Sequence, residues 1–399
     1  MSKALEGIRI LDLTHMLSGP YAAMIMTDLG ADTVKVEPLG GEGTRALLAR
    51  SAKFSRNGMG AYFITLNRGK KSICIDLKQA DGREVFYDLV RKADVVIDNF
   101  SAGVTTKLGI DHSALNAINN RIITCSITGF GKDGPNYQRP AFDQVVQGIS
   151  GGMSITGESG ERPMRSGIPI GDLGGGMFAV MGVLAALQAR STHGHGQHVD
   201  ISMLDCQVSM LNYMATMFLM SGENPQPLGN AHFVHVPYNT YHTSDGFIIV
   251  AVIYDSFWER LVELLDVDEF RVEKYHSQPG RLADRSTIDD RLNEVFRTKS
   301  TAHWLEQLNS ARIPCAPVNH FSETLSDPQV LHRHMVVKIK QAGGDEVEVP
   351  GNPVKLSLDG EDTFGSPPLL GEHTNSVLAD ILGYAPEKIS ALHGQKVVG

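Results

Sequence analysis

Short apolar runs rich in β-branched residues alternate, in the first half of the chain, with segments whose apolar residues recur at helical spacing. The two periods separate buried strands from amphipathic helices. The runs that predict strands are residues 8–13, 33–37, 72–77, 94–100, 121–130 and 196–203. Segments between them, such as residues 21–30 and 82–93, have the helical pattern.

Residues 8–37 have the order strand, turn, helix, strand. Pro20 suits the opening of a helix and Gly30 suits its end, because proline fixes a helical φ and glycine accepts the left-handed conformation that follows a helix. A chain that repeats this strand–helix–strand order forms a parallel sheet with helices on both faces. We therefore predict an α/β protein with a doubly wound, Rossmann-like large domain.

The second half of the chain predicts a smaller α/β domain. A Gly- and Ala-rich helical stretch covers residues 173–187, a Met-rich helical run follows residue 203, and residues 222–240 are rich in Pro, Gly and Asn, as linkers are. Residues 241–252 have a strand–turn–strand pattern, residues 339–351 a hairpin pattern and residues 375–383 a helical one. The expected division is 1–222 for the first part of the large domain, 223–325 for the small domain, and 326–399 for a return to the large domain.

Composition narrows the class of protein. The chain has 399 residues, enough for more than one core, with 42% hydrophobic and 20% charged residues, which excludes a disordered or coiled-coil protein. Its net charge of −9 comes without a basic block, so nucleic acid is not expected as a partner. Forty-one glycines favour a loop-rich enzyme.

Cysteine spacing and the chain start bear on cellular location. The four cysteines, Cys74, Cys125, Cys206 and Cys315, have neither metal-site nor disulfide-framework spacing, and are expected to be buried thiols in a reducing compartment. No signal peptide pattern opens the chain, and the longest apolar stretch, residues 173–187, is shorter than the ~20 residues of a membrane span. We expect a cytoplasmic protein with no membrane partner and no metal.

Two generic motifs do not fit their surroundings. The loop after the first strand has only Gly19 where a dinucleotide site needs G-x-G-x-x-G, and Glu37, at the position of a ribose-binding acid, is expected to be a solvated surface group. Residues 148–152 read G-x-S-x-G, but a nucleophile elbow needs a strand before the serine, and the preceding segment has helical composition. A dinucleotide-dependent oxidoreductase stays an alternative of a different class, whereas a serine hydrolase is disfavoured.

Asp172 is the candidate for chemistry. An Asp directly before an apolar helix can cap it, which is the structural interpretation. Glycines at 171, 174, 175 and 176 favour a functional one, because they would leave room for a bulky substrate at the carboxylate. An ionised carboxylate of this kind can attack an acyl carbon and form a covalent intermediate.

Taken together, seven segments resemble one family, the class III coenzyme A transferases, which also include α-methylacyl-CoA racemases. The segments are residues 5–38, LNRGKKSICIDLK at 66–78, ADVVIDNF at 93–100, Gly171–Asp172, GHGQHVDISMLD at 194–205, IPCAPV at 313–318 and PPLLGEHT at 367–374. The resemblance implies an open-ring subunit, two of which interlock as a homodimer. It also implies that coenzyme A is a substrate, with no permanently bound cofactor.

The same resemblance implies roles for individual residues. Asp172 would attack an acyl-CoA thioester, and CoA thiolate would open the anhydride to an aspartyl-CoA thioester. Backbone N–H groups of residues 171–176 or 16–18 would hold the oxyanion. Positions that match the family's CoA site are Met16, Leu17, Ser18, Ile75, Lys78, Asn99, Phe100, Lys107 and Arg139. Candidate substrate-binding residues are Phe142, Arg165, His232, His235 and Tyr238.

Departures from the family pattern bear on the substrates. Phe142 stands where racemases have a catalytic histidine and cannot exchange a proton. Leu17 stands where formyl-CoA:oxalate transferases have glutamine, and the segment GNAHFVHVPYNT lacks their glycine run. The expected function is CoA transfer between short dicarboxylic or hydroxy acids with a succinyl-CoA type donor. Formyl-CoA/oxalate transfer, a racemase-like isomerase and a non-catalytic acyl-CoA binder remain alternatives.

Overall fold

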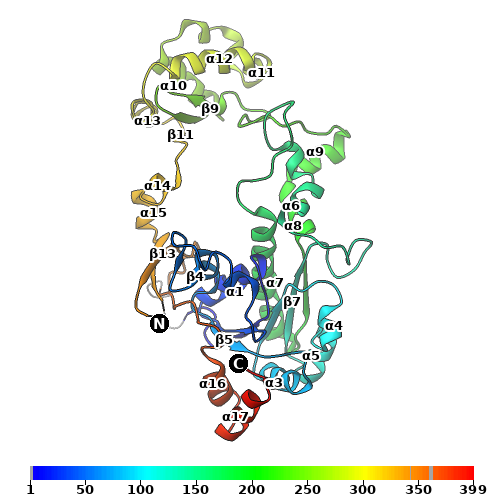
Figure 1. Ribbon diagram of the computed structural model, residues 1–399. Helices are drawn as coiled ribbons and strands as arrows, with labels where there is room; N and C mark the ends of the chain where they lie inside the picture. Colours follow the sequence, from blue (N-terminus) through cyan, green and yellow to red (C-terminus); the bar gives the residue numbers. More distant parts are fainter. Residues whose placement is uncertain (1–2, 342, 359–362) are drawn as a thin grey trace. The chain divides into compact units, whose positions relative to one another are not determined.

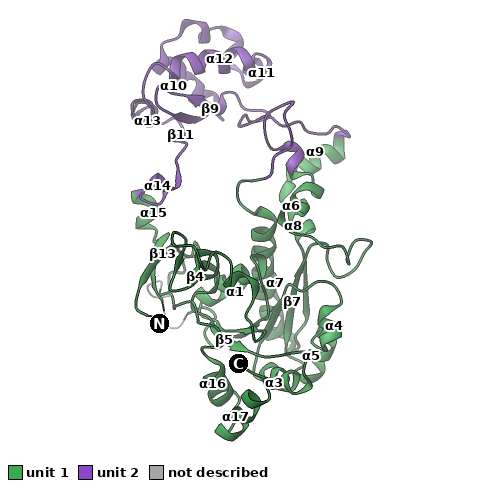
Figure 2. Cartoon of the chain, viewed as in Figure 1, with its two compact units in different colours: residues 1–152, 166–220, 328–399 green, residues 153–165, 221–327 purple. Residues whose placement is uncertain are grey.

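The computed structural model describes residues 3–341, 343–358 and 363–399, which form two compact units (Figure 2). Unit 1 takes in residues 1–152, 166–220 and 328–399, and unit 2 takes in residues 153–165 and 221–327. The structure thus groups residues 153–165 with the segment that follows residue 220, which the expected boundaries did not include.

A parallel sheet of six strands is the centre of unit 1 (Figure 1). Its strands, in spatial order, are β5 (Lys71–Cys74), β2 (Asp32–Glu37), β1 (Arg9–Asp12), β6 (Val95–Asp98), β7 (Ile123–Thr128) and β8 (His198–Ser202). All six strand predictions are confirmed. The chain reverses its direction of winding between β1 and β6, the strand order of a doubly wound sheet, and ligands bind at the carboxyl ends of the strands at such a switch point.

Helices pack on both faces of this sheet. One core contains α1 (Ser18–Asp28) and α7 (Ile170–His193), which pack side by side over Ile10, Ile97 and Ile123 (Figure 1). The other core contains α3 (Ala80–Val90), α5 (His112–Ile118) and the C-terminal α17 (Pro386–Gly394). Strands covered on both faces explain the continuous Val and Ile runs that predicted them.

The helix predicted at residues 173–187 is longer in the structure. With its 24 residues, α7 is, among the described residues, the one helix long and apolar enough to cross a membrane by length and composition, so the expectation that this stretch is too short is wrong. It packs against α1, β7 and α8 (Met203–Leu211), the position of a core helix.

Smaller elements complete unit 1. They are α2 (Ala61–Asn67), α4 (Val104–Leu108), α6 (Asp143–Ile149), α9 (Tyr213–Ser221), α15 (Pro328–His332), α16 (Thr374–Ser376), and the hairpins β3–β4 (Ser55–Arg56, Met59–Gly60) and β12–β13 (Val336–Lys340, Glu346–Pro350). The predicted hairpin at 339–351 is confirmed as β12–β13. The last residues return to the sheet through a bridge between Ile75 and Val398.

Unit 2 has its own core around a three-stranded antiparallel sheet. Its elements are β9 (Tyr238–His242), β10 (Phe247–Ala251), β11 (Cys315–Pro317), α10 (Asp255–Leu265), α11 (Gln278–Ala283), α12 (Arg285–Phe296), α13 (Thr301–Ser310) and α14 (Phe321–Thr324). The strand–turn–strand pattern at 241–252 corresponds to β9 and β10. Cys315 in β11 is half-buried, whereas Cys74, Cys125 and Cys206 are buried as expected.

Candidate active site

The loop after β1 is held at the carboxyl edge of the sheet by buried charges. Asp12 accepts hydrogen bonds from the Thr14 backbone N–H (2.9 Å) and from Lys70 Nζ (2.8 Å). Lys35 Nζ donates to the Thr14 carbonyl (2.8 Å). Burial would raise the pKa of Asp12, but Lys70 and Lys35 outweigh it and lower that pKa to about 2. The carboxylate is therefore charged, and the loop that follows has a fixed start.

Asn99 fixes the next residue of the same loop. Its Oδ1 accepts from the His15 backbone N–H (2.9 Å) and its Nδ2 donates to the His15 carbonyl (2.7 Å). The His15 ring lies edge-on to Phe100, with ring centroids 5.0 Å apart. Burial and Lys35 lower the pKa of His15, so the imidazole is neutral at pH 7. Asn99, predicted to contact CoA, thus uses both side-chain groups to position this loop.

A cavity of about 570 Å³ opens beside the loop at the carboxyl ends of β1, β2, β5 and β6. Ile75, Lys78, Phe100 and Lys107, all predicted to contact CoA, line it. His15, which was not predicted, also lines it. Two lysines beside an apolar wall suit a ligand with both an aromatic ring and phosphates.

Of the other predicted CoA residues, Met16, Leu17 and Ser18 continue the loop from His15 into α1. Met16 has φ +63°, a left-handed conformation rare for residues with a side chain, so the loop turns sharply there. Arg139 is not among the residues that line the cavity; its guanidinium lies 5.7 Å from the Phe130 ring centroid. The structure therefore gives Arg139 no place in this cavity.

Glu37 was expected to be a solvated surface acid, and that expectation is wrong. The residue is 1% exposed, and Arg45 binds both carboxylate oxygens, from Nε to Oε2 (2.6 Å) and from Nη2 to Oε1 (2.7 Å). Ser72 Oγ donates a further hydrogen bond to Oε1 (2.7 Å). The carboxylate is used within the fold and is not free to bind a ribose.

Asp172 lies in the first turn of α7 and is not its cap, so the structural interpretation of this residue is wrong. The helix begins at Ile170, and Asp143 accepts from its first N–H groups: Asp143 Oδ1 lies 2.8 Å from Gly171 N and 3.3 Å from Asp172 N. Asp143 Oδ2 accepts from Gln147 Nε2 (2.7 Å). With Asp143 as the cap, the Asp172 carboxylate is left for another role.

The environment of Asp172 raises its basicity. Burial, and then the neighbouring Asp143 carboxylate, raise the pKa of Asp172 to about 6. The carboxylate is still mostly ionised at pH 7, and a more basic carboxylate is a stronger nucleophile. Burial and the charges of Asp172, Glu42 and Asp143 raise the pKa of Tyr62 to about 12, so its phenol stays protonated near the two aspartates.

The glycines beside Asp172 have a different role from the one expected. A Cβ on Gly174 would lie 2.7 Å from Met210 Cε, and one on Gly175 would lie 2.9 Å from Ser18 Oγ. A Cβ on Gly176 would lie 2.7 Å from the Ser18 carbonyl oxygen. These glycines allow α7 to approach α1 and α8 closely, so they bring the start of α1 to the turn of α7 that carries the aspartate; they do not clear space for a substrate.

Phe142 directly precedes α6 and is 70% exposed, next to the capping Asp143. The serine of the G-x-S-x-G motif, Ser150, follows α6, as the helical composition predicted. Its Oγ donates to the Gln147 carbonyl (3.1 Å) and is buried. A helix before the serine confirms that the motif is not a nucleophile elbow.

The other predicted substrate residues belong to unit 2. The His232 ring lies 4.7 Å from the His235 ring and 5.1 Å from the Tyr238 ring, so the structure brings these three together. His232 Nδ1 accepts from two backbone N–H groups, of Val234 and His235, which gives it a structural role in the turn. Arg165 is exposed in the same unit. Their relation to Asp172 stays a prediction.

Sequence reasoning missed three residues of the site: His15, Tyr62 and Asp143. Tyr62 lies in a segment without any charged or motif residue, so no local signal could have found it. Asp143 directly follows Phe142, and the pattern of an acid at the start of a helical segment could have identified it as a capping residue, although not as a neighbour of Asp172.

Comparisons with known proteins agree with this geometry. A family model described as CoA-transferase family III matches residues 5–374. The succinate–glutarate CoA-transferase of Agrobacterium fabrum is 37% identical over 94% of this chain and 95% of its own length, and the succinyl-CoA:mesaconate CoA-transferase of Haloarcula marismortui is 34% identical over 94% and 96%. A crystal structure of a CAIB/BAIF family protein from Brucella suis, 34% identical, covers 96% of this chain and 100% of that chain with a TM-score of 0.85.

Proposed function

Because the chain belongs to CoA-transferase family III and is an enzyme of the transferase class, we propose that it transfers CoA between short dicarboxylic or hydroxy acids, with Asp172 as the covalent carrier. The observation that carries the proposal is the Asp172 carboxylate, which does not cap α7, is largely buried and has its pKa raised to about 6. It lies in a turn of α7 that packs against the loop beside the cavity of about 570 Å³, which we call the CoA cavity.

The reaction consists of four displacements. The Asp172 carboxylate attacks the thioester carbon of the donor, the C–S bond breaks, and CoA departs as a thiolate. The product of this step is an anhydride between the donor acyl group and Asp172. The thiolate attacks the aspartyl carbon, and the donor acid departs as carboxylate. The acceptor carboxylate displaces the thiolate from the aspartyl thioester, and the thiolate then takes the acceptor acyl group. Protons are neither gained nor lost, and Asp172 is regenerated.

The oxyanion of each step needs hydrogen-bond donors. The N–H groups of Gly171 and Asp172, expected among the donors, are bonded to Asp143. The first N–H groups of α1 have no intrahelical acceptor, and the buried Ser18 Oγ has no hydrogen-bond partner among the described residues. We assign the oxyanion site to the start of α1, at Ser18 and Gly19, where preorganised donors stabilise developing charge.

Relatives support the choice of substrates. The named relatives act on succinate, glutarate or mesaconate as acids or CoA esters, and each of these has two carboxylates. The second carboxylate of the acceptor would bind to cationic or hydrogen-bonding side chains. Candidates for this role are Arg165, His235 and Tyr238, with Phe142 as an apolar contact. His232 uses its Nδ1 within the turn, so at most its Nε2 would take part.

Assembly and location belong to the same proposal. The resemblance implies an open-ring subunit that interlocks with a second copy as a homodimer, and an enzyme that takes CoA as a substrate and holds no permanent cofactor. A cytoplasmic location is proposed from the spacing of the four cysteines, which suits thiols in a reducing compartment. The exposed apolar side chains of α7 and α9, such as Met181 and Leu219, support a further contact surface on unit 1.

The test is a panel of acyl-CoAs, succinyl-CoA first, each incubated with free glutarate, mesaconate, malate or oxalate, with the CoA esters formed identified by mass spectrometry. We expect exchange with dicarboxylic acids in the wild type and none in Asp172→Ala or Asp172→Asn, both of which should still bind CoA. Exchange by either variant would contradict the role of Asp172, and wild-type exchange with oxalate but with none of the longer acids would favour the formyl-CoA/oxalate alternative instead.

A further inference from the structure

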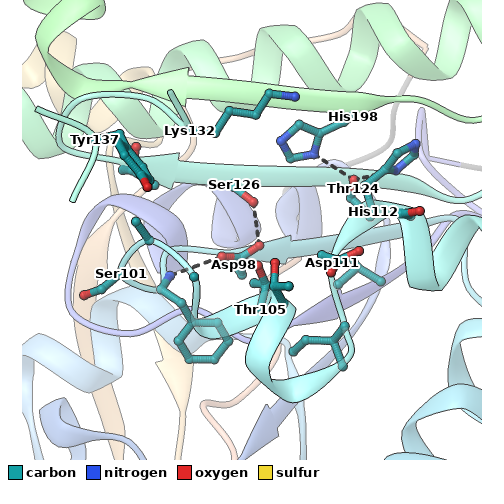
Figure 3. Close-up of a pocket in the computed structure, with 18 of the residues that line it drawn as sticks. Asp98, Ser101, Thr105, Asp111, His112, Thr124, Ser126, Lys132, Tyr137 and His198 are labelled. Carbon is teal, nitrogen blue, oxygen red and sulfur yellow. Dashed lines mark hydrogen bonds between the residues drawn. The ribbon is translucent and has the colours of Figure 1, made fainter. Parts of the chain in front are cut away.

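A second cavity, of about 510 Å³, lies on the face of the sheet opposite α7. Figure 3 shows the residues that line it. On β7, Ile123, Cys125 and Ile127 face the core that contains α7, and the alternate residues Thr124 and Ser126 line this cavity. Parallel sheets are usually covered by apolar contacts on both faces. A polar cavity on one face of a parallel sheet is therefore unusual and needs an explanation.

Two histidines share one hydroxyl in this cavity. Thr124 Oγ1 lies 2.9 Å from His112 Nδ1 and 2.8 Å from His198 Nδ1 (Figure 3). A hydroxyl has one proton, so at least one of the two rings must donate its Nδ1–H to the Thr124 oxygen. Because Thr124 is 4% exposed, the pair of rings is fixed in place by a buried group. Both rings line the cavity, and in the described part of the chain their side-chain hydrogen bonds go through Nδ1 alone.

A cation and an anion face each other across the same cavity. Lys132 extends toward His198, and its charge contributes to the lowering of the pKa of both His112 and His198 (Figure 3). Among the residues that the structure describes, no carboxylate forms an ion pair with the Lys132 ammonium. Asp98 lines the other side, where it accepts from Ser126 Oγ (2.7 Å) and from the Phe100 N–H (3.2 Å).

Asp98 has acceptor capacity left. A carboxylate accepts about four hydrogen bonds, and the side chain uses two. Burial raises its pKa to about 6, so it is mostly ionised at pH 7 and can accept from a donor in the cavity. The other acids nearby are occupied: Asp111 caps α5 through Ala114 N, and Asp200 accepts from the Lys132 backbone N–H.

We propose that this cavity is a second ligand site, separate from the active site, for a small hydroxycarboxylic acid whose carboxylate binds Lys132 and a histidine and whose hydroxyl donates to Asp98. A plain anion would satisfy only the cationic side, and a plain polyol only Asp98. A molecule with both groups fits the pairing of opposite charges, as polar groups of a ligand site fix the orientation of a ligand.

The two cavities are neighbours through α4. Thr105 and Thr106 line the second cavity, whereas Val104, Lys107 and Leu108 of the same helix line the CoA cavity. Phe100 lines both cavities. A ligand that fixes the positions of Asp98 and Phe100 would therefore change the affinity of the protein for CoA. Bound CoA would change the affinity of the protein for that ligand by the same factor.

The site is tested by nuclear magnetic resonance of the full-length protein labelled at histidine, with the signals of His112 and His198 assigned from a Gln variant of each. Malate is the probe, added at millimolar concentration against chloride of equal ionic strength. A bound carboxylate stabilises the imidazolium, so we expect malate to raise the pKa of one or both rings by about half a unit to one unit. The signal of His15 reports separately on the CoA cavity.

Two variants and a second acid decide the outcome. Lys132→Ala should abolish the shift, and Lys92→Ala, which removes an exposed lysine elsewhere, should leave it intact. Succinate, which lacks the hydroxyl, should shift the rings less than malate does. Absence of a shift with malate, or the same shift in Lys132→Ala, would overturn the site, and equal shifts with the two acids would overturn the role of Asp98. None of these results depends on transferase activity.

Discussion

Removal of the charge on Asp143 should lower the pKa of Asp172. The rise from 3.8 to about 6 has burial as its larger cause and Asp143 as the second. The total rise is about two units, and since burial is its larger cause, the share of Asp143 is at most about one unit. In Asp143→Asn, the side-chain oxygen can still accept from Gly171 N, because Asn is as good a helix cap as Asp.

The assay is kcat/KM for CoA transfer as a function of pH. With Asp172 as the proposed nucleophile, only its ionised form would attack the thioester, so activity should fall as pH falls through the pKa of that residue in the free enzyme. Loss of a neighbouring negative charge favours ionisation, and we expect the acid limb in Asp143→Asn to move to lower pH by up to about one unit. The rate on the plateau should fall modestly, because the carboxylate is less basic.

A matched variant separates charge from geometry. In the wild type, Gln147 Nε2 donates a hydrogen bond to Asp143 Oδ2. Asn at position 143 would put an amide nitrogen there, so two hydrogen-bond donors would face each other. The double variant Asp143→Asn, Gln147→Glu restores a donor–acceptor pair and returns one negative charge to the site, so its acid limb should lie close to that of the wild type. An acid limb unmoved in the single variant, or moved to higher pH, would refute the electrostatic reasoning.

Three further substitutions test other contacts. Lys107→Ala should raise the KM for acyl-CoA by roughly three- to tenfold and weaken its dependence on salt, with kcat unchanged, as steady-state kinetics at two ionic strengths would show. Gly176→Ala should destabilise the protein by about 1–3 kcal/mol in urea unfolding, because its Cβ would meet backbone at the start of α1, whereas Gly174→Ala, which meets the end of a flexible side chain, should cost less than about 1 kcal/mol. Lys70→Met should cost about 3–5 kcal/mol in the same assay, because buried Asp12 loses its ion-pair partner and keeps only the charge of Lys35 and the hydrogen bonds from Thr14; a change below 1 kcal/mol would contradict the importance of that pair.

The parallel sheet could be predicted because its signal is local. Strands such as β6 and β7 are buried, and their continuous Val and Ile runs follow directly from that burial. The extent of α7 was less predictable: the helix continues through Arg190 and His193, and Arg190 pairs with Asp94, a partner far away in the sequence. Local periodicity does not report such a contact.

Lys78, Phe100 and Lys107 were expected at the CoA site from the resemblance, and the structure brings them to one cavity because they follow strands whose carboxyl ends meet at one edge of the sheet. Residues whose role depends on a partner elsewhere in the chain were not predictable. Glu37 was misjudged because its partner, Arg45, lies in a short 3-10 helix (Gly43–Arg45) that no sequence pattern indicates. The cap of α7 was misjudged because it comes from Asp143, in another helix.

The most direct test of the central claim is to incubate the enzyme with succinyl-CoA, add hydroxylamine or borohydride, and locate the modification by peptide mass spectrometry. The account predicts a hydroxamate or a reduced side chain at Asp172, formed only when the thioester is present. An enzyme that turns over while Asp172 stays unmodified, or a label at another carboxylate, would contradict it.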